Sequence, residues 1–457
     1  MNVSRSIFRQ YDIRGVVDRE LTPALARALG RAYATLGWQR LGRAPVLAVG
    51  QDNRPSGAAL AGAVRAGIAE TGGTAVDVGQ LPTPALYFAV HALAIDGGMQ
   101  VTGSHNPPEF NGFKMVLAGE TLHSDAIQQL YEIISLESWQ APEVAGGESA
   151  DLSILARYRA AIIEHHHLRR PVRVVLDCGN GVGSLIAVAT LEGLGAEVIP
   201  LFCESDGRFP NHHPDPTVLE NLRDLQAAVR RTGAELGIAF DGDADRIGAV
   251  DETGQIIFGD QLLVLYGRDA VRRFGPGVPV IFDVKCSEVL PDALRAAGAI
   301  PDMWKTGHSL IKARMTELAA PLAGEMSGHM FFGGDWYGFD DALFGAARLL
   351  EIVAAGPGGL AALLADLPRK FTTPEIRFDC PEERKFSLVE RASAHFAARY
   401  PVNPIDGVRM NFAHGWGLIR ASNTQPVLVL RFEATTEADL AAYQAEVMGW
   451  LDAAMGK

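Results

Sequence analysis

One pattern recurs three times along about the first three hundred residues: an apolar run, a polar turn, a stretch of helical periodicity and a second apolar run. The paired apolar runs lie at 46–50 and 75–78, at 172–177 and 196–202, and at 278–284 and around Ile300. Short β-branched runs that alternate with helical stretches are typical of βαβ units with parallel strands. Because the copies are about a hundred residues apart, we expect three similar α/β domains with mixed sheets.

The C-terminal part of the chain follows a different pattern. After the glycine-rich stretch 356–359, apolar runs at 408–412, 416–419 and 427–432 indicate an antiparallel sheet, and 440–455 has an amphipathic helical pattern. We therefore expect a fourth, smaller α+β domain. Proline, glycine and acidic residues at 141–148 predict the first linker. The expected domains are 1–148, 149–255, 256–367 and 368–457.

Composition limits the possible partners. The formal net charge of −13 argues against nucleic acid, because binding to a phosphate backbone needs a basic surface. No apolar run approaches the ~20 residues of a membrane helix, and the arginine-containing start lacks the apolar core of a secretory signal. Four scattered cysteines suit a reducing cytosol. We expect a cytoplasmic monomer with no nucleic-acid or membrane partner.

The strongest local signal is the stretch Val-Thr-Gly-Ser-His-Asn-Pro-Pro at 101–108. Gly103 and Asn106-Pro107 favour an irregular turn over a helix. Such a turn can present the hydroxyl of Ser104 to a ligand, with His105 and Lys114 able to supply hydrogen-bond donors or positive charge. A capping serine in a surface loop is the alternative.

A second signal is the stretch Phe-Asp-Gly-Asp-Ala-Asp-Arg at 240–246, which follows an apolar run. If the chain is extended there, Asp241, Asp243 and Asp245 face the same way, and a divalent cation would relieve their mutual repulsion. Oxygen ligands favour magnesium or calcium over zinc. A calcium EF-hand is rejected because Arg246 stands where that loop needs glycine. An aspartyl phosphatase or a solvated acidic turn remain alternatives.

A third signal is Gly-Glu-Met-Ser-Gly-His at 324–329. Its carboxylate and hydroxyl, two residues apart, suit adjacent sugar hydroxyls, and its glycines allow a ligand to approach closely. A tight turn with a capping serine is an equal alternative.

A fourth signal is Arg-Ala-Ser-Asn-Thr-Gln-Pro at 420–426, between two apolar runs. An arginine, two hydroxyls, an amide and backbone N–H groups can form a phosphate site. An ordinary polar hairpin loop is the alternative. The four signals occur once each in four successive expected domains, which favours one shared active site.

Together these motifs resemble the α-D-phosphohexomutase superfamily, and most closely its bacterial phosphomannomutase/phosphoglucomutase group. The resemblance covers nearly the whole chain, from Phe-Arg-Gln-Tyr-Asp-Ile-Arg-Gly at 8–15 through the four loops in the family order. It implies a heart-shaped molecule with a central active-site cleft. It also implies a magnesium-dependent isomerase that interconverts the 1-phosphates and 6-phosphates of glucose and mannose. A phosphoserine and a hexose 1,6-bisphosphate, both intermediate and activator, would carry the reaction.

The resemblance also implies a role for each matching residue. Ser104 would be the phosphoserine and, with Asp241, Asp243 and Asp245, would hold Mg²⁺. The other catalytic positions would be Lys114, Arg246, His308 and His329, and His308, His329 and Lys114 are alternatives for proton transfer. Substrate would be bound by Tyr11, Arg14, His105, Lys285, Lys305, Glu325, Ser327, Arg420, Ser422, Asn423 and Thr424. The run His165-His166-His167 is expected to be a solvated helix end.

Two other functions remain open at this stage. Phosphoglucosamine mutases usually have glutamine where this chain has Met326, so the sugar loop favours hexose over hexosamine phosphates. A sugar-phosphate-binding module without activity is the alternative outside enzymes, and the intact serine and acidic loops argue against it.

Overall fold

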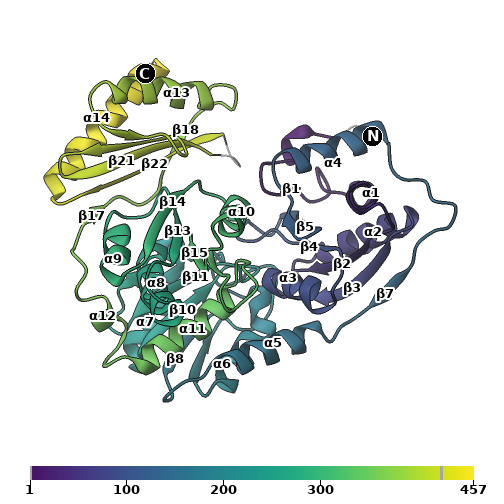
Figure 1. Cartoon of the computed structure of the whole chain (residues 1–457), viewed down its shortest axis with the longest axis horizontal. Helices are drawn as coiled ribbons and strands as arrows, with labels where there is room; N and C mark the ends of the chain where they lie inside the picture. The colour runs from purple at the N-terminus through teal and green to yellow at the C-terminus, as the bar shows by residue number, and fades with distance from the viewer. Residues whose placement is uncertain (1–2, 423–425, 457) are drawn as a thin grey trace.

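The computed structural model describes residues 3–422 and 426–456, and in this part of the chain the strands form four successive sheets. In Figure 1 the first sheet and its helices lie on the right, the second and third lie at the centre, and the fourth lies at the upper left. Three α/β domains and a C-terminal α+β domain are confirmed. The predicted heart shape and central cleft remain predictions.

The first sheet has seven strands in the order β1-β5-β4-β2-β3-β7, and β6 pairs with β5. β2 is parallel to β3 and β4, and β7 is parallel to β3, whereas β1, β4 and β6 are antiparallel to β5. The strands are β1 (Ile13–Val16), β2 (Val46–Gln51), β3 (Thr74–Gln80), β4 (Gly97–Val101), β5 (Phe110–Leu117), β6 (Glu120–Thr121) and β7 (Glu148–Ala150), and the helices are α1 (Pro23–Leu41), α2 (Gly57–Glu70), α3 (Thr83–Ala92) and α4 (Asp125–Leu136).

The ends of α1 show how local sequence sets an element. Thr22 caps the helix by accepting the N–H of Leu25 at 3.2 Å, and Pro23 occupies the first helical position, where no donor is lost. Gly42 ends the helix in a left-handed conformation.

The second and third domains each combine parallel strands with antiparallel ones: β10–β11 and β11–β12 are antiparallel in the second, and β15–β16 in the third. The five-stranded sheet has the order β12-β11-β10-β8-β9, and the four-stranded sheet has the order β14-β13-β15-β16. The second contains β8 (Arg173–Asp177), β9 (Glu197–Leu201), β10 (Leu236–Phe240), β11 (Ile247–Asp251), β12 (Ile256–Ile257), α5 (Ile154–His165), α6 (Ala187–Gly193) and α7 (Arg223–Thr232). The third contains β13 (Pro279–Asp283), β14 (Ile300–Trp304), β15 (Leu322–Gly324), β16 (Met330–Phe332), α8 (Gly259–Phe274), α9 (Val289–Ala297), α10 (His308–Leu318), α11 (Ala342–Ala355) and α12 (Leu360–Leu363).

The fourth domain is an antiparallel sheet with two helices. Its six strands have the order β17-β22-β21-β20-β19, with β18 beside β22. Its elements are β17 (Phe371–Thr372), β18 (Ile376–Asp379), β19 (Val402–Asn403), β20 (Val408–Phe412), β21 (Gly415–Ala421), β22 (Val427–Ala434), α13 (Lys385–Ala397) and α14 (Glu437–Met455). The predicted strands and C-terminal helix are therefore present.

The cores join the domains. One apolar cluster runs from α3 of the first domain through the second and third domains, and includes Leu86, Tyr158, Leu176, Phe282 and Phe344. A smaller buried cluster of Val284, Trp416 and Leu418 joins the third domain to the fourth. The loops of neighbouring domains are thus held by packed contacts, which fixes where their polar side chains meet.

Two details qualify the sequence analysis. Residues 148–150 form β7 and pair with the first sheet, so the predicted linker is followed by a strand of the first domain. The domain limits at 148, 255 and 367 remain predictions. His166 is buried at 5% exposure, so the expectation of a fully solvated histidine run is wrong at its central residue. No helix in the described residues is both long and apolar enough to cross a lipid bilayer.

Candidate active site

The serine loop, residues 102–109, joins β4 to β5. Ser104 is 1% exposed and has φ 49°, and its backbone N–H donates to Thr102 Oγ1 at 2.9 Å. A left-handed serine is rare enough to need support from its surroundings. The expectation that a turn presents this hydroxyl is consistent with this geometry.

That support comes from the buried ion pair of Arg54 and Asp52, which belongs to none of the four sequence motifs. Arg54 donates to the backbone oxygens of three loop residues, Ser104, Asn106 and Pro107, and of Phe110 at the start of β5, at 2.6 to 3.0 Å. Asp52 pairs with Arg54 at 3.1 Å and accepts the Thr102 hydroxyl at 2.8 Å. Gly103 is required here, because a Cβ would lie 2.5 Å from Arg54. Asp52 and Arg54 stand directly after β2. This position was the available sequence signal for their role, because polar turns at the ends of strands often form binding sites.

The acidic loop lies between β10 and β11. Asp241, Asp243 and Asp245 are each 0% exposed, and they offer ligand atoms within 4.8 Å of one another. The predicted convergence is correct, but a turn with Ala244 at φ 56° produces it instead of an extended chain. Asp241 Oδ1 accepts the N–H groups of Asp245 and Arg246, both at 3.1 Å, which fixes the loop.

The serine and acidic loops meet directly. The Ser104 hydroxyl donates to Asp241 Oδ2 at 2.9 Å and lies 3.2 Å from His105 Nδ1. Lys114, on β5, donates to Asp243 Oδ2 at 2.8 Å and also to Asp245. Thr83, at the start of α3, donates to the same oxygen of Asp243 at 2.6 Å.

The charges in this cluster shift one another's pKa values. Burial, together with Asp245 and Asp243, raises the pKa of Asp241 well above its ordinary value. Burial alone would lower the pKa of Lys114, but Asp243 and Asp245 raise it far above its ordinary value. The nearby cations Lys114 and Arg246 therefore offset only part of the repulsion among the three carboxylates.

The residues present fit a hard cation. Asp243 Oδ1 is buried and has no hydrogen-bond partner among the described residues, so its lone pairs are available to a ligand. Carboxylate oxygens are the ligands that Mg²⁺ and Ca²⁺ prefer. The cluster is therefore a candidate metal site whose cation would relieve the repulsion that raises the pKa of Asp241.

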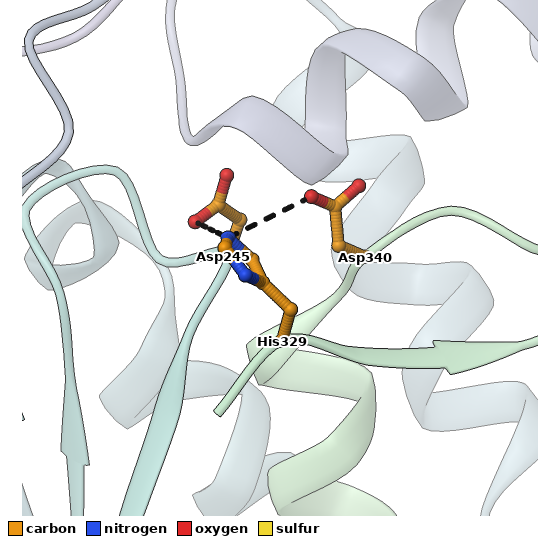
Figure 2. Close-up of side chains that lie close together, drawn as sticks. All are labelled: Asp245, His329 and Asp340. Carbon is orange, nitrogen blue, oxygen red and sulfur yellow. Dashed lines mark ion pairs between the residues drawn. The ribbon is translucent and has the colours of Figure 1, made fainter. Parts of the chain in front are cut away.

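His329 connects the acidic loop to the sugar loop, residues 325–329, which joins β15 to β16. Its Nε2 lies 3.2 Å from Asp245 Oδ1 and 3.9 Å from Asp340 Oδ2, and its Nδ1 lies 3.0 Å from Glu325 Oε2. Figure 2 shows the ion pairs of His329 with the two aspartates. Burial alone would lower the pKa of His329, but Asp245 raises it to about 9. The imidazole is therefore charged at neutral pH.

Asp340 lies beside His329. No sequence motif surrounds Asp340, so the sequence did not indicate that it belongs to the site. It is 0% exposed, accepts Lys312 Nζ at 2.9 Å and lies 3.7 Å from His308 Nδ1. Burial, with Lys312 and Lys114 nearby, holds the pKa of His308 well below its ordinary value. The two histidines thus have opposite protonation preferences although their rings are 5.8 Å apart.

The sugar loop contacts the start of α10 and, through it, the first domain. Glu325 Oε1 accepts the Gly307 N–H at 2.6 Å, and the Ser327 hydroxyl lies 3.2 Å from His329 Nδ1. Tyr11 donates its hydroxyl to the backbone oxygen of Thr306 at 2.7 Å. Only glycine fits at 307, which has φ 132° and a Cβ position 2.5 Å from the Tyr11 ring.

Arg420, on β21, is 6% exposed and brings the fourth domain into contact with the third. Its Nε donates to Asp406 Oδ2 at 3.0 Å, and the same oxygen accepts the Thr306 N–H at 3.0 Å. Asp406 was not expected from the sequence. Lys285 Nζ lies 3.4 Å from Glu375 Oε2, at the same junction of the third and fourth domains.

The predicted site residues are thus largely brought together. A series of contacts links residues of all four domains: Ser104 to Asp241, Lys114 to Asp243, Asp245 to His329, His329 to Glu325, Glu325 to Gly307, Thr306 to Asp406, and Asp406 to Arg420. Arg14 joins the serine loop by donating to Asn106 Oδ1 at 2.8 Å. Ser422 is buried and Lys305 is exposed, while Asn423 and Thr424 lie outside the described residues.

Comparison with known proteins agrees with this arrangement. Four family models match in order: phosphoglucomutase/phosphomannomutase alpha/beta/alpha domains I, II and III at residues 5–141, 156–254 and 258–371, and the C-terminal domain at 375–449. A phosphomannomutase/phosphoglucomutase of Pseudomonas aeruginosa is 49% identical over 437 residues, covering 95% of this chain and 93% of the relative. A phosphoglucomutase of Neisseria gonorrhoeae is 44% identical over 446 residues, covering 97% and 96%.

The solved structures lead to the same family. The crystal structure of a phosphoglucomutase/phosphomannomutase family protein from Burkholderia thailandensis has a TM-score of 0.92 and 44% identity, and the match covers 99% of this chain and 98% of that one. With the four domain matches and the relatives above, this similarity extends over nearly the whole chain. The chain belongs to the phosphoglucomutase/phosphomannomutase family of the α-D-phosphohexomutase superfamily.

Proposed function

We propose that this mutase interconverts hexose 1-phosphates and hexose 6-phosphates, of both glucose and mannose, through a phosphoryl group carried on Ser104. The observation that carries the proposal is the 2.9 Å contact between the Ser104 hydroxyl and Asp241 of the acidic loop. It puts a nucleophile beside a group of oxygen ligands suited to a cation. The relatives named for both mannose and glucose support the choice of sugars.

In this proposal Asp241, Asp243 and Asp245, with the phosphorylated Ser104, would hold Mg²⁺. When bound, the ion would neutralise charge on the phosphoryl group that is transferred. Lys114 and Arg246 contribute further positive charge, since the buried Lys114 and the partly buried Arg246 both act on these carboxylates. Phosphoryl transfer depends mainly on such positioning and charge stabilisation.

The reaction consists of two balanced transfers. In the first, the phosphorus–oxygen bond to Ser104 breaks, a bond to the free hydroxyl of the sugar phosphate forms, and the hydroxyl proton passes to a protein base while the serine oxygen regains a proton. This gives a hexose 1,6-bisphosphate, which would also serve as activator. After the bisphosphate turns end for end, its other phosphoryl group returns to Ser104. His308, His329 and Lys114 are the proposed proton carriers.

The remaining predicted residues would hold the sugar phosphate in its two orientations. Glu325 and Ser327 would bind sugar hydroxyls, because they project from a loop that already contacts the acidic loop through His329. The phosphate that is not transferred would lie at Arg420, with Ser422, Asn423 and Thr424. Further contacts are proposed for Tyr11, Arg14, His105, Lys285 and Lys305.

We further propose that the protein works in the cytoplasm as a monomer without nucleic-acid or membrane partners. A formal net charge of −13 and four cysteines without disulfides support this setting. A small phosphosugar is then its partner.

The alternatives have less support. The N-acetylglucosamine-phosphate mutase with a solved substrate complex is only 14% identical and so shows the shared fold alone, whereas relatives at 44% to 49% identity are named for glucose or mannose. A phosphoglucosamine mutase is therefore not favoured. A binding module without activity would have no need for buried, converging carboxylates beside a buried serine.

Intact-mass measurement tests the proposal. The purified chain is incubated with glucose 1,6-bisphosphate and then with glucose 1-phosphate, and peptide mapping locates any phosphate gained. We expect one phosphate on Ser104 that moves to sugar, with glucose 6-phosphate as product. A chain that never carries phosphate on Ser104, or one that steadily releases inorganic phosphate, would contradict the proposal.

A further inference from the structure

Two cysteines of the second domain lie side by side just beyond the ends of the adjacent strands β8 and β9. Cys178 follows β8 and Cys203 lies two residues beyond β9, and their Sγ atoms are 3.3 Å apart. Both are free thiols. The adjoining backbones are already paired, since Cys178 N donates to Leu201 O at 3.2 Å and Asn180 N donates to Phe202 O at 2.8 Å. The two backbone segments are therefore close enough for a disulfide, in which the two sulfurs would be about 2.05 Å apart.

We propose that Cys178 and Cys203 are an oxidation site, at which a peroxide forms an intrachain disulfide that lowers the activity of the enzyme and that a thiol reductant reverses. Nothing in the mutase reaction uses either thiol. In the reducing setting proposed above the pair would rest as thiols.

The two sulfurs differ in a way that suits this chemistry. Cys178 is buried, whereas Cys203 is partly exposed and can be reached by a small oxidant. The neighbouring Cys178 thiol also lowers the pKa of Cys203, which raises the fraction of reactive thiolate.

The reaction balances with the peroxide as the only oxidant. The Cys203 thiolate attacks the peroxide, the O–O bond breaks, and an S–O bond forms to give a sulfenic acid and an alkoxide or hydroxide. The sulfur of Cys178 then attacks Cys203, the S–O bond breaks, and hydroxide leaves with the Cys178 proton as water. Two thiols are oxidised and one peroxide is reduced.

The effect on activity follows from the residues after Cys178. Val182 N donates to the Gly242 backbone oxygen at 3.0 Å, and Gly181 packs so closely that a Cβ there would lie 2.7 Å from the same oxygen. Gly242 stands between two of the acidic-loop aspartates and itself packs against the backbone oxygen of Ser104. A disulfide would bring the two sulfurs about 1 Å closer together and so shift residues 181 and 182, which pack against the acidic loop. A displacement of about 1 Å at a reacting centre costs a large part of the turnover rate.

The sequence permits a sharp test for the link. No lysine or arginine lies between Arg173 and Arg208, so one tryptic peptide, 174–208, contains both cysteines. Cleavage after Glu192 and Glu197 then separates them unless a disulfide holds the pieces together. The full chain is treated with hydrogen peroxide, its remaining thiols are alkylated, and the digests are compared before and after reduction. Mutase activity is measured on the same samples.

We expect the two pieces of peptide 174–208 to stay joined after peroxide, with turnover reduced on the order of tenfold, and both changes to reverse with dithiothreitol. C203S should abolish the link and keep its activity under peroxide, whereas C380S, at a buried cysteine of the fourth domain, should behave as wild type. Because the link is read from peptides, its failure is distinct from failure of the proposed function. Pieces that separate after peroxide in the wild type, or a link that leaves turnover unchanged, would overturn the proposal.

Discussion

The hydroxyl of Ser104 donates to Asp241 Oδ2 at 2.9 Å, although the two residues belong to different domains. This contact is the main requirement of the proposed chemistry, because a phosphoryl group on the serine must lie within reach of the acidic loop. Both side chains are almost completely buried, so water does not screen them from each other. The two motifs recognised separately in the sequence thus form one site.

Replacing the serine tests its role directly. Ser104→Ala should reduce turnover of glucose 1-phosphate to background, because the proposed phosphoryl carrier is then absent, while calorimetry should show that the sugar phosphate still binds. Ser387→Ala, at an exposed serine on α13, is the matched control and should behave as wild type. Turnover near the wild-type level in Ser104→Ala would remove the serine from the mechanism.

Asp243 provides the test of metal dependence. Asp243→Asn keeps the size of the side chain and can still accept the Thr83 hydroxyl, but it removes one negative charge from the proposed magnesium site. We expect turnover to fall on the order of 10²- to 10³-fold and the Mg²⁺ concentration for half-maximal activity to rise. Asp224→Asn, at an exposed aspartate on α7, is the control. An unchanged magnesium requirement in Asp243→Asn would argue against the site.

The fold was largely predictable because its strands are short apolar runs bounded by polar turns. The run predicted at 278–284 contains β13, and the one predicted at 408–412 coincides with β20. The burial of His166 was not predictable, since its neighbours in sequence look solvated. It packs instead against Phe344 of the third domain, at 4.5 Å between ring centroids, a contact between residues distant in sequence.

The candidate site was predictable where chemistry is concentrated in one loop and not where single residues support it from elsewhere. Asp340 and Asp406 lie outside the four motifs. Asp340 nevertheless lies beside His308 and His329, and Asp406 accepts a hydrogen bond from Arg420. The same holds for Arg54, whose function is to bind backbone oxygens of the serine loop about fifty residues away. A single polar residue carries no spacing pattern, so only the fold shows what it contacts.

Arg420 tests the phosphate site. Arg420→Ala removes a buried guanidinium, and charge-assisted hydrogen bonds of about 1.5–3 kcal/mol correspond to a rise in KM of roughly ten- to a hundredfold. We expect a smaller change in kcat and little change in phosphorylation of Ser104 by the bisphosphate. Arg391→Ala, at an exposed arginine on α13, serves as the control. A fall in kcat with unchanged KM would contradict a role in holding the distal phosphate.

The burial of His166 leads to a prediction of how the free energy of unfolding depends on pH. Burial, together with the positive charge of Arg348, lowers the pKa of His166 to about 3, whereas in the unfolded chain it would be about 6.5. Between these values the unfolded chain binds the extra proton, so the contribution of His166 to stability is fully present above about pH 6.5 and is lost as the pH falls. Each pH unit below that point should cost at most about 1.4 kcal/mol.

The variant that isolates this effect is His166→Gln, which cannot take up a proton and whose amide can still donate to Ile162 O, as His166 Nδ1 does at 3.0 Å. We expect urea unfolding midpoints of wild type and variant to converge, or to cross, as the pH falls from 7.5 to 5, since about 2 kcal/mol of the wild-type advantage disappears. His167→Gln changes an exposed neighbour that is hydrated in both states, so its difference from wild type should stay constant. A constant difference for His166→Gln as well would show that burial of this imidazole does not set the acid sensitivity of the fold.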